Sequence, residues 1–475
     1  MTGDWAPFEA YAERMMAAYQ VPGIAVAVAQ DGKQVFGRGF GWRDRERELP
    51  VTENTVFGIG SITKSFTAVA IMQLEEEGKL SVEDPVVKYL PEFRVGKDGA
   101  AGKITIHHFL THTSGLPPLP SLFLCMAPSM QGDPSVKDFP LSVGVDGKQP
   151  IYTYEQLMDF IASLDVQLLG PPGAYFSYSN DAYALLGAIV ERVSGQSYES
   201  FVTERILEPL GMEHTTFDLK VMEQFPEVTE LYAARENNGK EEAYAAPQWW
   251  EAPAMVAAGF LRSNVGDLLR YMEVYRTGGV GNGRRILSAE SVARMTAPHV
   301  WCEPGLYYGY GLVIHPNYHG VSLVEHGGGI KGVSAYVSCV PEKGVTGAAL
   351  ANLAGVPSGQ ILLGAMNIIL GLPVDTRRFD YPDYACPPER LERYAGEYRS
   401  GEGAQIKVSV TDGTLQVEMQ GKRMHARPVG VGMFVIKQKE EESLLRFLFN
   451  ARGEVYAVAS GFRIIPRVGG LARTA

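Results

Sequence analysis

Residues 57–64 read Phe-Gly-Ile-Gly-Ser-Ile-Thr-Lys and open a long apolar helical pattern. Ser61 and Lys64 stand three residues apart, so on a helix they share one face. A serine hydroxyl is a poor nucleophile and needs a base beside it. Gly58 and Gly60 allow a tight turn that places Ser61 at a helix start, where free N–H groups favour a developing anion. The stretch predicts a nucleophilic serine with a lysine base; a capping serine and a solvated lysine are the alternative.

A second candidate segment is Tyr178-Ser179-Asn180, which precedes an apolar helical pattern. A tyrosine phenolate can take the proton of a serine when nearby positive charge stabilises it. The side chain of Asn180 is suited to orienting the lysine or a substrate carbonyl. Taken alone, the same residues also fit a buried tyrosine and a helix-capping asparagine.

A third candidate segment is the run His326-Gly327-Gly328-Gly329, which we expect at the start of a strand. Consecutive glycines let a substrate approach the backbone closely. A backbone N–H in this run, together with that of Ser61, would form the two-donor oxyanion hole that acyl transfer needs. The alternative is a glycine-rich loop with one structural histidine.

Together these three segments resemble, in order and spacing, the motifs of the penicillin-recognising serine hydrolases. That family holds class C β-lactamases, DD-carboxypeptidases, D-aminopeptidases and related esterases. Residues 61–64 look like its S-x-x-K motif, and residues 178–180 look like its Y-x-N motif. Residues 326–328 match the H-x-G form of its third motif, which is usual in the peptidase and esterase branch. The resemblance spans roughly residues 5–370.

The resemblance implies a role for each residue of the first two motifs. Ser61 is the nucleophile that becomes acylated. Lys64 and Tyr178 form the general-base pair, and the choice between them stays open. Asn180 helps to hold Lys64 and contacts the substrate.

The third motif is where this chain departs from β-lactamases, which carry K-T-G there. His326 takes the place of that lysine, and Gly328 completes the motif. Gly329, the next residue, is expected to supply the second oxyanion N–H. Because a neutral histidine meets a substrate carboxylate less strongly than a lysine does, the departure speaks against efficient turnover of β-lactams.

The resemblance implies an α+β fold with an antiparallel sheet flanked by helices and a helical subdomain. Hydrophobic periodicity gives the expected elements. Helices are expected over residues 8–19, 62–78, 182–193, 264–272 and 361–370, and strands over 24–29 and 34–42, with two more strands within 321–352. Residues 116–150 show no clear periodicity and predict a long loop.

The C-terminal residues differ from the rest of the chain in composition and in hydrophobic pattern. Four prolines within residues 373–389 predict a linker. Short alternating strands follow, without a helical pattern, and predict a small all-β barrel. Residues 394–398 resemble the lipocalin-like barrel appended to some cytoplasmic members of the peptidase branch. We therefore expect a β-lactamase-like domain over residues 1–373, a linker over 374–388 and the barrel over 389–475. All three motifs precede residue 333, so we expect no catalytic residue in the barrel.

The composition and charge of the chain indicate which kinds of partner it is suited to bind. The net charge of −11 argues against nucleic acid as the main partner. Residues 389–475 carry a net charge of +4 and the remainder −15, so the two parts should attract each other. No apolar run is long enough for a transmembrane helix, so no membrane partner is expected. The first residues lack the features of a secretory signal, which indicates a cytoplasmic protein unless a leader has been removed.

No metal or cofactor is expected. The four cysteines form no C-x-x-C pair, which gives no support for a zinc cluster or a disulfide framework. His108 and His112 stand four residues apart, but they lack the glutamate of H-E-x-x-H. We expect packing, not metal binding, from this pair.

These features predict a serine hydrolase that acts through an acyl-enzyme on amide or peptide bonds. By analogy with the H-x-G branch, the expected substrate is a small molecule or a peptide, including peptides with D-residues. An esterase or a weak β-lactamase of the same fold is the alternative. A catalytically silent binding protein is the alternative from another class. A homo-oligomer is compatible with the extra C-terminal module.

Overall fold

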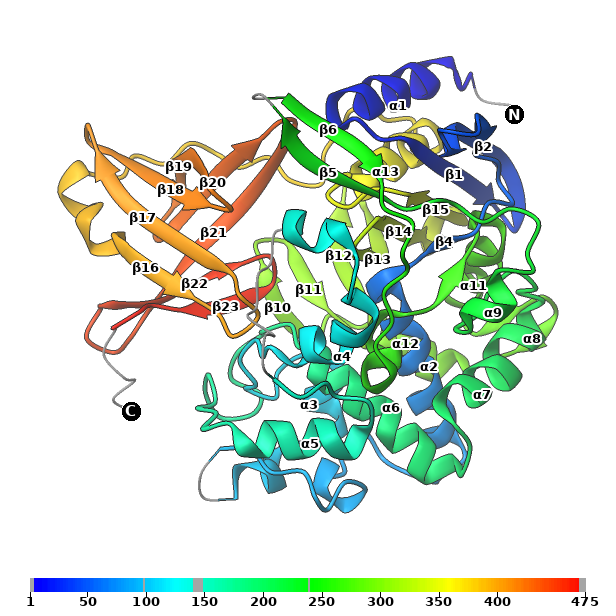
Figure 1. The fold of residues 1–475 in the computed structure, drawn as a ribbon, viewed down its shortest axis with the longest axis horizontal. Coiled ribbons are helices and arrows are strands. Elements are labelled where there is room, and N and C mark those ends of the chain that lie inside the picture. The colour runs from blue at the N-terminus through cyan, green and yellow to red at the C-terminus, as the bar shows by residue number, and fades with distance from the viewer. Residues whose placement is uncertain (1–3, 97–98, 140–147, 238–239, 470–475) are drawn as a thin grey trace.

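The computed structural model describes residues 4–96, 99–139, 148–237 and 240–469. Its largest element is a nine-stranded antiparallel sheet in the order β10-β11-β12-β13-β14-β15-β1-β2-β3. Its strands are β1 (Gly23–Gln30), β2 (Lys33–Asp44), β3 (Leu49–Pro50), β10 (Val300–Glu303), β11 (Leu306–Tyr308), β12 (Val313–Tyr318), β13 (Val321–Ile330), β14 (Val333–Val340) and β15 (Val345–Ala351). Because β1 pairs with β15, segments far apart in the chain build one sheet (Figure 1).

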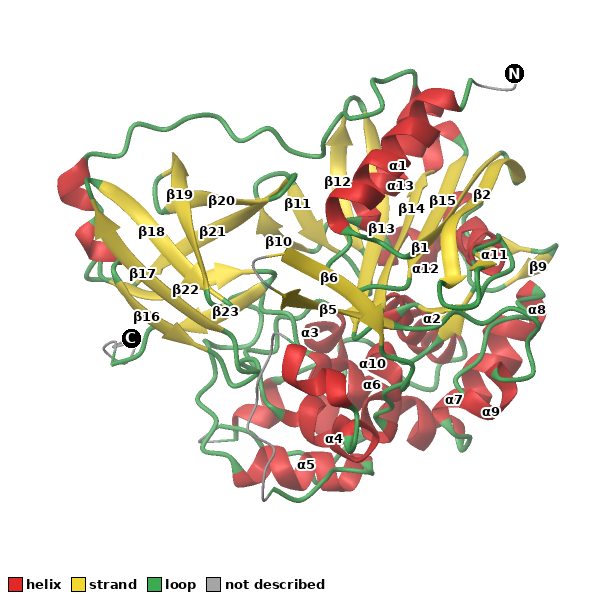
Figure 2. Cartoon of the chain, turned by 45° about the horizontal axis from the view of Figure 1, so that its top comes forward, coloured by secondary structure: helices red, strands yellow, loops and turns green. Residues whose placement is uncertain are grey.

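Helices cover both faces of this sheet (Figure 2). The helices α1 (Ala6–Tyr19) and α13 (Ser358–Leu370) lie on one face, and α2 (Thr63–Glu76) and α11 (Val265–Arg276) lie on the other. In β1, Ile24, Val26 and Val28 pack toward α1 and α13, and the alternating alanines pack toward α11. This period of two is that of a strand buried on both sides. The predicted α+β sheet flanked by helices is confirmed.

The predicted helical subdomain is also present. Its main helices are α3 (Ile106–Leu110), α4 (Ser121–Met130), α5 (Tyr154–Ser163), α6 (Asn180–Ser194), α7 (Tyr198–Val202) and α10 (Val256–Gly259). The helix α6 begins where the Ser179 side chain accepts a hydrogen bond from the backbone N–H of Ala182. It ends at Gly195, whose φ of 76° suits a glycine. Asn180 is thereby fixed in the first turn of a buried helix.

The long loop predicted over residues 116–150 is wrong for residues 121–130, which form α4. Pro128 lies inside this helix, and its presence in the sequence masked the helical pattern. Phe123, Leu124 and Met126 of α4 are buried in the main core, and this burial holds the helix in place. Residues 140–147, which the same prediction covered, lie outside the described residues.

Residues 321–352 form three strands, β13, β14 and β15, where the sequence predicted two. The missed turn lies at Lys331-Gly332, and Gly332 has a φ of 68°. His326 consequently lies inside β13 and not at the start of a strand, as predicted. The glycines after His326 looked like a loop, but they are strand residues that pair with β14.

Shorter elements connect these layers. They are the helices α8 (Glu208–Leu210), α9 (Leu219–Met222) and α12 (Ala289–Met295), and the strands β4 (Phe57–Gly58), β5 (Tyr232–Asn237), β6 (Lys240–Ala245), β7 (Arg262–Ser263), β8 (Val280–Gly281) and β9 (Arg284–Arg285). Among the described residues, no helix is both long and apolar enough to cross a bilayer.

The C-terminal residues form an eight-stranded, nearly closed barrel in which each strand pairs with the next along the chain. Its strands are β16 (Gly396–Arg399), β17 (Gln405–Thr411), β18 (Thr414–Met419), β19 (Lys422–Gly430), β20 (Met433–Gln438), β21 (Glu441–Phe449), β22 (Val455–Ser460) and β23 (Arg463–Pro466). A bridge between Tyr398 and Arg467 brings the first strand to the last. Tyr394, Phe434 and Phe447 pack inside. The predicted all-β barrel is confirmed.

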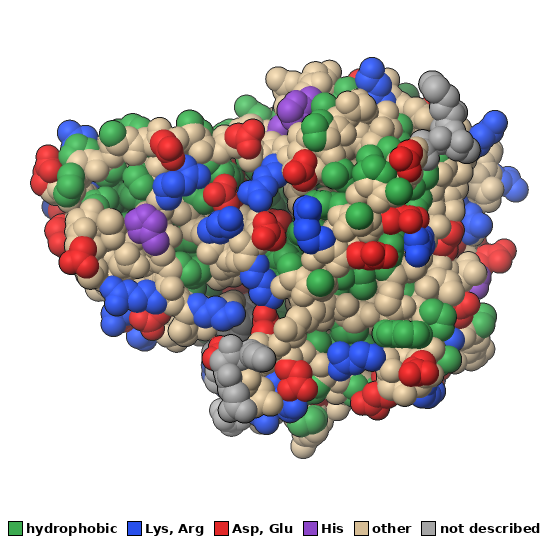
Figure 3. Space-filling view, turned by 90° about the horizontal axis from the view of Figure 1, so that it is seen from above, with side chains coloured by type: hydrophobic (Ala, Val, Ile, Leu, Met, Phe, Trp, Pro, Cys, Tyr) green, Lys and Arg blue, Asp and Glu red, His purple; other side chains and the backbone are tan. Residues whose placement is uncertain are grey.

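The barrel (residues 396–466) and the N-terminal part (residues 4–373) touch along an extended junction. Basic and acidic side chains lie side by side on the face shown in Figure 3. Across the junction, Lys439 of the barrel forms an ion pair with Glu241. Apolar contacts add to this attraction: Phe462 packs on Phe176 with ring centroids 5.6 Å apart. The connecting residues are themselves held, because Arg378 forms a buried ion pair with Glu325 of β13. The division at residues 373 and 388 stays a prediction.

Candidate active site

Ser61 lies in a single 3₁₀ turn, Gly60–Ile62, directly before α2. The Thr63 hydroxyl donates to the carbonyl of Gly60 at 2.7 Å and accepts from the N–H of Leu261 at 3.2 Å, which locks the turn. Ser61 borders two cavities, one of about 640 Å³ and one of about 140 Å³. The serine predicted as a nucleophile is thus held on a rigid turn and reachable from two sides.

Lys64 is fully buried, and its Nζ atom lies at the centre of a polar cluster. It donates to Asn180 Oδ1 at 2.8 Å and to the carbonyl of Ala258 at 2.6 Å, and it lies 3.2 Å from Ser61 Oγ. Burial holds the pKa of Lys64 well below its ordinary value, and the positive charge of Arg463 lowers it further. A lysine with a lowered pKa can give up and regain a proton near neutral pH.

The side chain of Tyr178 lies beside both Lys64 and Ser61. Lys64 Nζ is 4.7 Å from the centre of its ring, and the guanidinium carbon of Arg463 is 5.0 Å from it. Burial raises the pKa of the Tyr178 hydroxyl, whereas its hydrogen bond with Ser61 and the charge of Arg463 act in the opposite direction. The net shift is upward, so the resting hydroxyl keeps its proton.

The glycines of the third motif bring β13 against the turn that carries Ser61. A Cβ atom on Gly328 would lie 1.9 Å from the carbonyl oxygen of Ile59 and 3.0 Å from the backbone N of Ser61. A Cβ atom on Gly60, whose φ is +51°, would lie 2.7 Å from the backbone N of Gly329. Only glycine permits this approach. The backbone nitrogens of Ser61 and Gly329 therefore both lie at this contact between β13 and the turn. That they form the oxyanion hole stays a prediction.

His326 is buried within a chain of hydrogen bonds whose ends are both backbone groups. The N–H of Ser179 donates to His112 Nδ1 at 3.0 Å, which leaves the proton of His112 on Nε2, 3.3 Å from the Tyr308 hydroxyl. At the other end, His326 Nδ1 must donate to the carbonyl of Gly327 at 2.6 Å. The Tyr308 hydroxyl therefore donates to His326 Nε2 at 2.9 Å.

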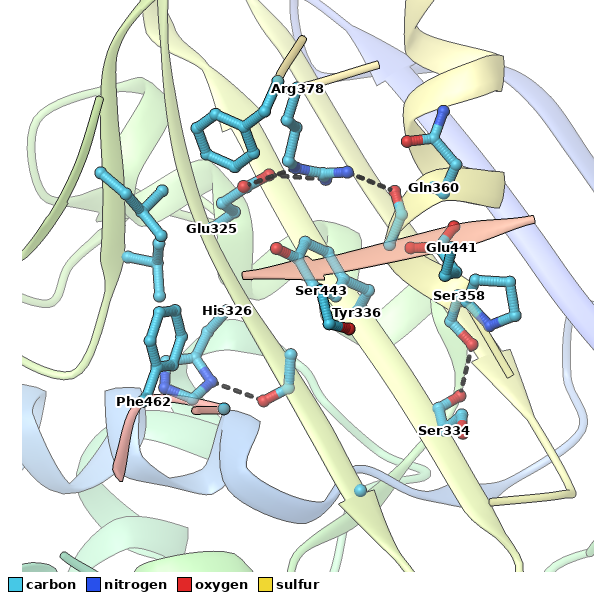
Figure 4. A pocket seen from close by; sticks show the side chains of 18 of the residues that line it. Glu325, His326, Ser334, Tyr336, Ser358, Gln360, Arg378, Glu441, Ser443 and Phe462 are labelled. Carbon is cyan, nitrogen blue, oxygen red and sulfur yellow. Dashed lines mark hydrogen bonds and ion pairs between the residues drawn. The ribbon is translucent and has the colours of Figure 1, made fainter. Parts of the chain in front are cut away.

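This chain fixes His326 as a neutral ring. Burial lowers the pKa of His326 to about 3, and the positive charge of Lys64 contributes to this shift. In Figure 4, His326 lies at the edge of the larger cavity with its bond to the Gly327 carbonyl. A cation like the lysine of K-T-G is thus missing from this position of the described structure.

The barrel also reaches the site. Arg463 of β23 and Glu402, in the loop between β16 and β17, border the smaller cavity together with Ser61. Arg463 forms an ion pair with Glu402, and Glu402 Oε1 lies 3.5 Å from Asn180 Nδ2. We expected no catalytic residue in the barrel, which stays a prediction, but the sequence did not indicate that these two barrel residues lie beside the site.

A family model described as Beta-lactamase matches residues 8–367. The chain belongs to the β-lactamase family. It has the fold that β-lactamases share with penicillin-binding proteins. It is 29% identical to Penicillin-binding protein 4 of Amycolatopsis lactamdurans over 74% of this chain and 86% of that protein. It is also 33% identical to Protein flp of Staphylococcus aureus strain MW2, but this match spans 42% of the chain and about a third (35%) of that relative's length.

Solved structures extend the likeness to the barrel. The octameric penicillin-binding protein homologue from Pyrococcus abyssi is 30% identical, with a TM-score of 0.71, and the match covers 97% of this chain and 100% of that chain. A D-stereospecific amidohydrolase from Streptomyces sp. is 26% identical, with a TM-score of 0.59, over 76% of this chain and 98% of that chain.

The structure brings together all seven residues predicted from the three motifs of the β-lactamase family, but it adds others that the sequence did not single out. His112 was expected only to pack, so the sequence analysis gave it no place in the site. Tyr308 had no signal, because it stands beside another tyrosine in a short inner strand of the sheet. Glu402 and Arg463 are single charges in a strand-rich region, and only the docked barrel reveals their place.

Proposed function

We propose that the protein is a serine hydrolase that cleaves amide or peptide bonds through an acyl-enzyme. Ser61 Oγ attacks the carbonyl carbon, and its proton passes to Lys64 Nζ by way of the Tyr178 hydroxyl. The N–H groups of Ser61 and Gly329 stabilise the oxyanion. The proton then moves to the leaving amine, and water releases the acyl group by the reverse path.

The observation that carries this proposal is the buried Lys64 Nζ atom, 3.2 Å from Ser61 Oγ. Its lowered pKa favours a neutral amine, whereas the raised pKa of Tyr178 keeps the phenol protonated. We therefore assign the resting base to Lys64 and a proton-relay role to Tyr178. Asn180 orients Lys64, and neutral His326, whose two ring nitrogens bond to Gly327 and Tyr308, forms part of the wall of the larger cavity.

The two cavities support a substrate with two unlike halves. The smaller cavity is walled mainly by apolar side chains, which suit an apolar side chain on the acyl half. These are Leu122, Phe123, Met126, Phe139, Phe260 and Ile330. The larger cavity is lined by many charged groups and suits a polar leaving half. The likeness to a D-stereospecific amidohydrolase supports D-configured amino-acid amides and peptides as the first choice.

The test uses a fluorophosphonate probe and a panel of substrates. The probe should label Ser61 in the full chain and leave Ser61→Ala unlabelled. Among D- and L-amino-acid p-nitroanilides, p-nitrophenyl esters and nitrocefin, D-anilides with apolar side chains should have the highest kcat/KM relative to their intrinsic reactivity. Wild-type turnover by Ser61→Ala would overturn the mechanism. A preference for nitrocefin or for simple esters would overturn the substrate class and favour the alternatives.

Assembly and location belong to the same proposal. The octameric relative supports a homo-oligomer, which light scattering coupled to size exclusion would detect as a mass that is a multiple of 51.9 kDa. All four cysteines are free thiols, which suits a reducing cytoplasm.

A further inference from the structure

The loop between β16 and β17 carries a carboxylate into the site. Glu402 is only 4% exposed, although it belongs to a short surface loop of the barrel. The preceding Gly401 lets the loop come close, since a Cβ atom there would lie 2.5 Å from the carbonyl oxygen of Pro118. A buried carboxylate needs partners, and Glu402 finds one on each side of the junction.

The first partner is Asn180, whose amide is held from both ends. Asn180 Oδ1 accepts from Lys64 Nζ at 2.8 Å, and Asn180 Nδ2 lies 3.5 Å from Glu402 Oε1. Lys64 requires an oxygen and the carboxylate requires an N–H, so both contacts select the same orientation of the amide. Glu402 thus acts on Lys64 through Asn180.

The second partner is Arg463, which acts on Tyr178. Its Nε–H donates to Glu402 Oε2, and its guanidinium lies 5.0 Å from the ring centre of Tyr178. The backbone beside Arg463 holds the same segment, because the N–H of Tyr178 donates to the carbonyl of Phe462 at 2.8 Å. The barrel therefore fixes Tyr178 through both its ring and its backbone.

We propose that Glu402 and Arg463 are positioning residues of the hydrolase, and that the barrel thereby completes the catalytic centre. Glu402 sets the Asn180 amide and so the place of Lys64, while Arg463 holds Tyr178 against Ser61. This inference rests on the proposed function, in which Lys64 and Tyr178 move the serine's proton. It makes the barrel a part of the reaction's machinery, beyond any role in admitting substrate or in assembly.

The two barrel charges act on Lys64 with opposite sign. Arg463 lowers the pKa of Lys64, whereas Glu402 raises it, and Asp181 of α6 also raises it. The other groups that face Lys64 are uncharged at rest: they are the rings of Tyr178 and Tyr183 and the neutral His112 and His326. Removing one barrel charge at a time should therefore move the titration of Lys64 in opposite directions.

The experiment measures the acylation rate of the full chain with a p-nitrophenyl ester as a function of pH, for Glu402→Gln, Arg463→Gln and the double variant. Each single variant should lower kcat roughly 10- to 100-fold, with a smaller change in KM, because misplaced catalytic groups act on the chemical step. The acid limb of the rate profile should move to lower pH in Glu402→Gln and to higher pH in Arg463→Gln. In the double variant, the limb should return toward its wild-type position.

Two further variants separate positioning from simple loss of structure. Arg463→Lys keeps the charge, so it should restore the wild-type acid limb without full recovery of kcat. Arg399→Gln removes an exposed arginine of the same barrel, which pairs with exposed Glu397, and should change neither quantity. Shifts of the limb in one common direction, or wild-type kcat in both single variants, would overturn the inference. If a single variant fails to fold in a thermal melt, Arg463→Lys and the double variant decide by the same readouts.

The same measurements keep this inference apart from the proposed function. If the probe labels Ser61 in the wild type and in both variants at the same rate, only the inference fails. If Ser61→Ala keeps the activity of the wild type, the proposed function fails and the inference fails with it.

Discussion

The contributions of Lys64 and Tyr178 to kcat are expected to depend on each other. Lys64→Ala and Tyr178→Phe should each lower kcat by several orders of magnitude, because each removes a group that transfers the proton of Ser61. The double variant should be little worse than either single one, since residues that act as a unit lose most of their effect together. Steady-state kinetics on one activated amide checks this expectation. Strict additivity, or inhibition by EDTA that zinc reverses, would contradict the mechanism.

Because His326 is buried, the free energy of unfolding should decrease as the pH falls. Burial lowers its pKa to about 3, whereas an unfolded histidine titrates near 6.5. Between these values the unfolded chain binds a proton that the folded chain refuses, so stability falls as the pH falls from about 6.5 toward 3. The slope for one such group is about 1.4 kcal/mol per pH unit.

Replacing His326 should therefore flatten the loss of stability at acid pH. His326→Gln should show a smaller decrease in the free energy of unfolding between pH 6.5 and 4 than the wild type, measured from urea transitions. His425→Gln is the matched control, because this histidine is exposed on the barrel. Equal slopes for the wild type and His326→Gln would show that His326 is not buried as a neutral ring.

At the residue scale, the sequence predicted the groups that stand in motifs and missed those that act by position. Ser61, Lys64 and Asn180 were found because helical spacing and motif order point to them. Tyr308 and Arg463 became visible only in the fold, because a hydrogen bond or a charge contact across the chain leaves no pattern in the local sequence.

At the scale of elements, the close approach of β13 to the turn at Ser61 is the most sensitive feature. Gly328→Ala would set a methyl group 1.9 Å from the carbonyl oxygen of Ile59, so β13 or the turn must move. Because oxyanion stabilisation depends on sub-ångström geometry, kcat should fall by roughly 10²–10³-fold. Fluorophosphonate labelling rates and urea transitions measure the two effects separately.

Gly102→Ala is the control for that substitution, since a Cβ atom on Gly102 has no neighbour within 4 Å. It should leave both labelling rate and stability at wild-type values. A Gly328→Ala protein that is labelled as fast as the wild type would show that the contact between β13 and the turn is loose.

Most elements were predictable because their burial follows a simple period. The helix α1 buries residues three and four positions apart, and the strand β18 buries every second residue over its first part. The helices α6 and α13 and the strand β1 were found instead as apolar runs, because they are buried along most of their length. The prediction failed where a special residue hid the period. Pro128 hid α4, and the glycines after His326 hid the second half of β13, although tertiary packing holds both.

At the scale of the whole molecule, the residues between the N-terminal part and the barrel matter for stability. Glu325 is fully buried and its ion-pair partner is Arg378, beyond the predicted boundary at residue 373. A chain ending after Pro373 leaves this carboxylate unpaired, whereas a chain ending after Tyr381 keeps its partner. Breaking a buried pair by removing one partner costs roughly 3–5 kcal/mol.

We therefore expect the chain that ends after Tyr381 to unfold at clearly higher urea concentration than the chain that ends after Pro373. Equal midpoints would show that solvent reaches Glu325. Both truncated chains lack Glu402 and Arg463, so both should acylate slowly even with a small activated ester. The sequence predicted two modules of opposite charge, but it gave no sign of which surfaces meet, because Phe176 and Phe462 look like ordinary core residues.

The contact between Ser177 and Ile464 joins residues 287 positions apart and has a consequence for the timing of synthesis. A ribosome adds about 5–20 residues per second, so the Ser61 turn emerges tens of seconds before the last strand. Until that strand folds, Tyr178 lacks the contacts that hold it, so we expect the nascent chain to acylate slowly. After dilution from denaturant, hydrolysis should accordingly return later than the near-ultraviolet signal of the buried core.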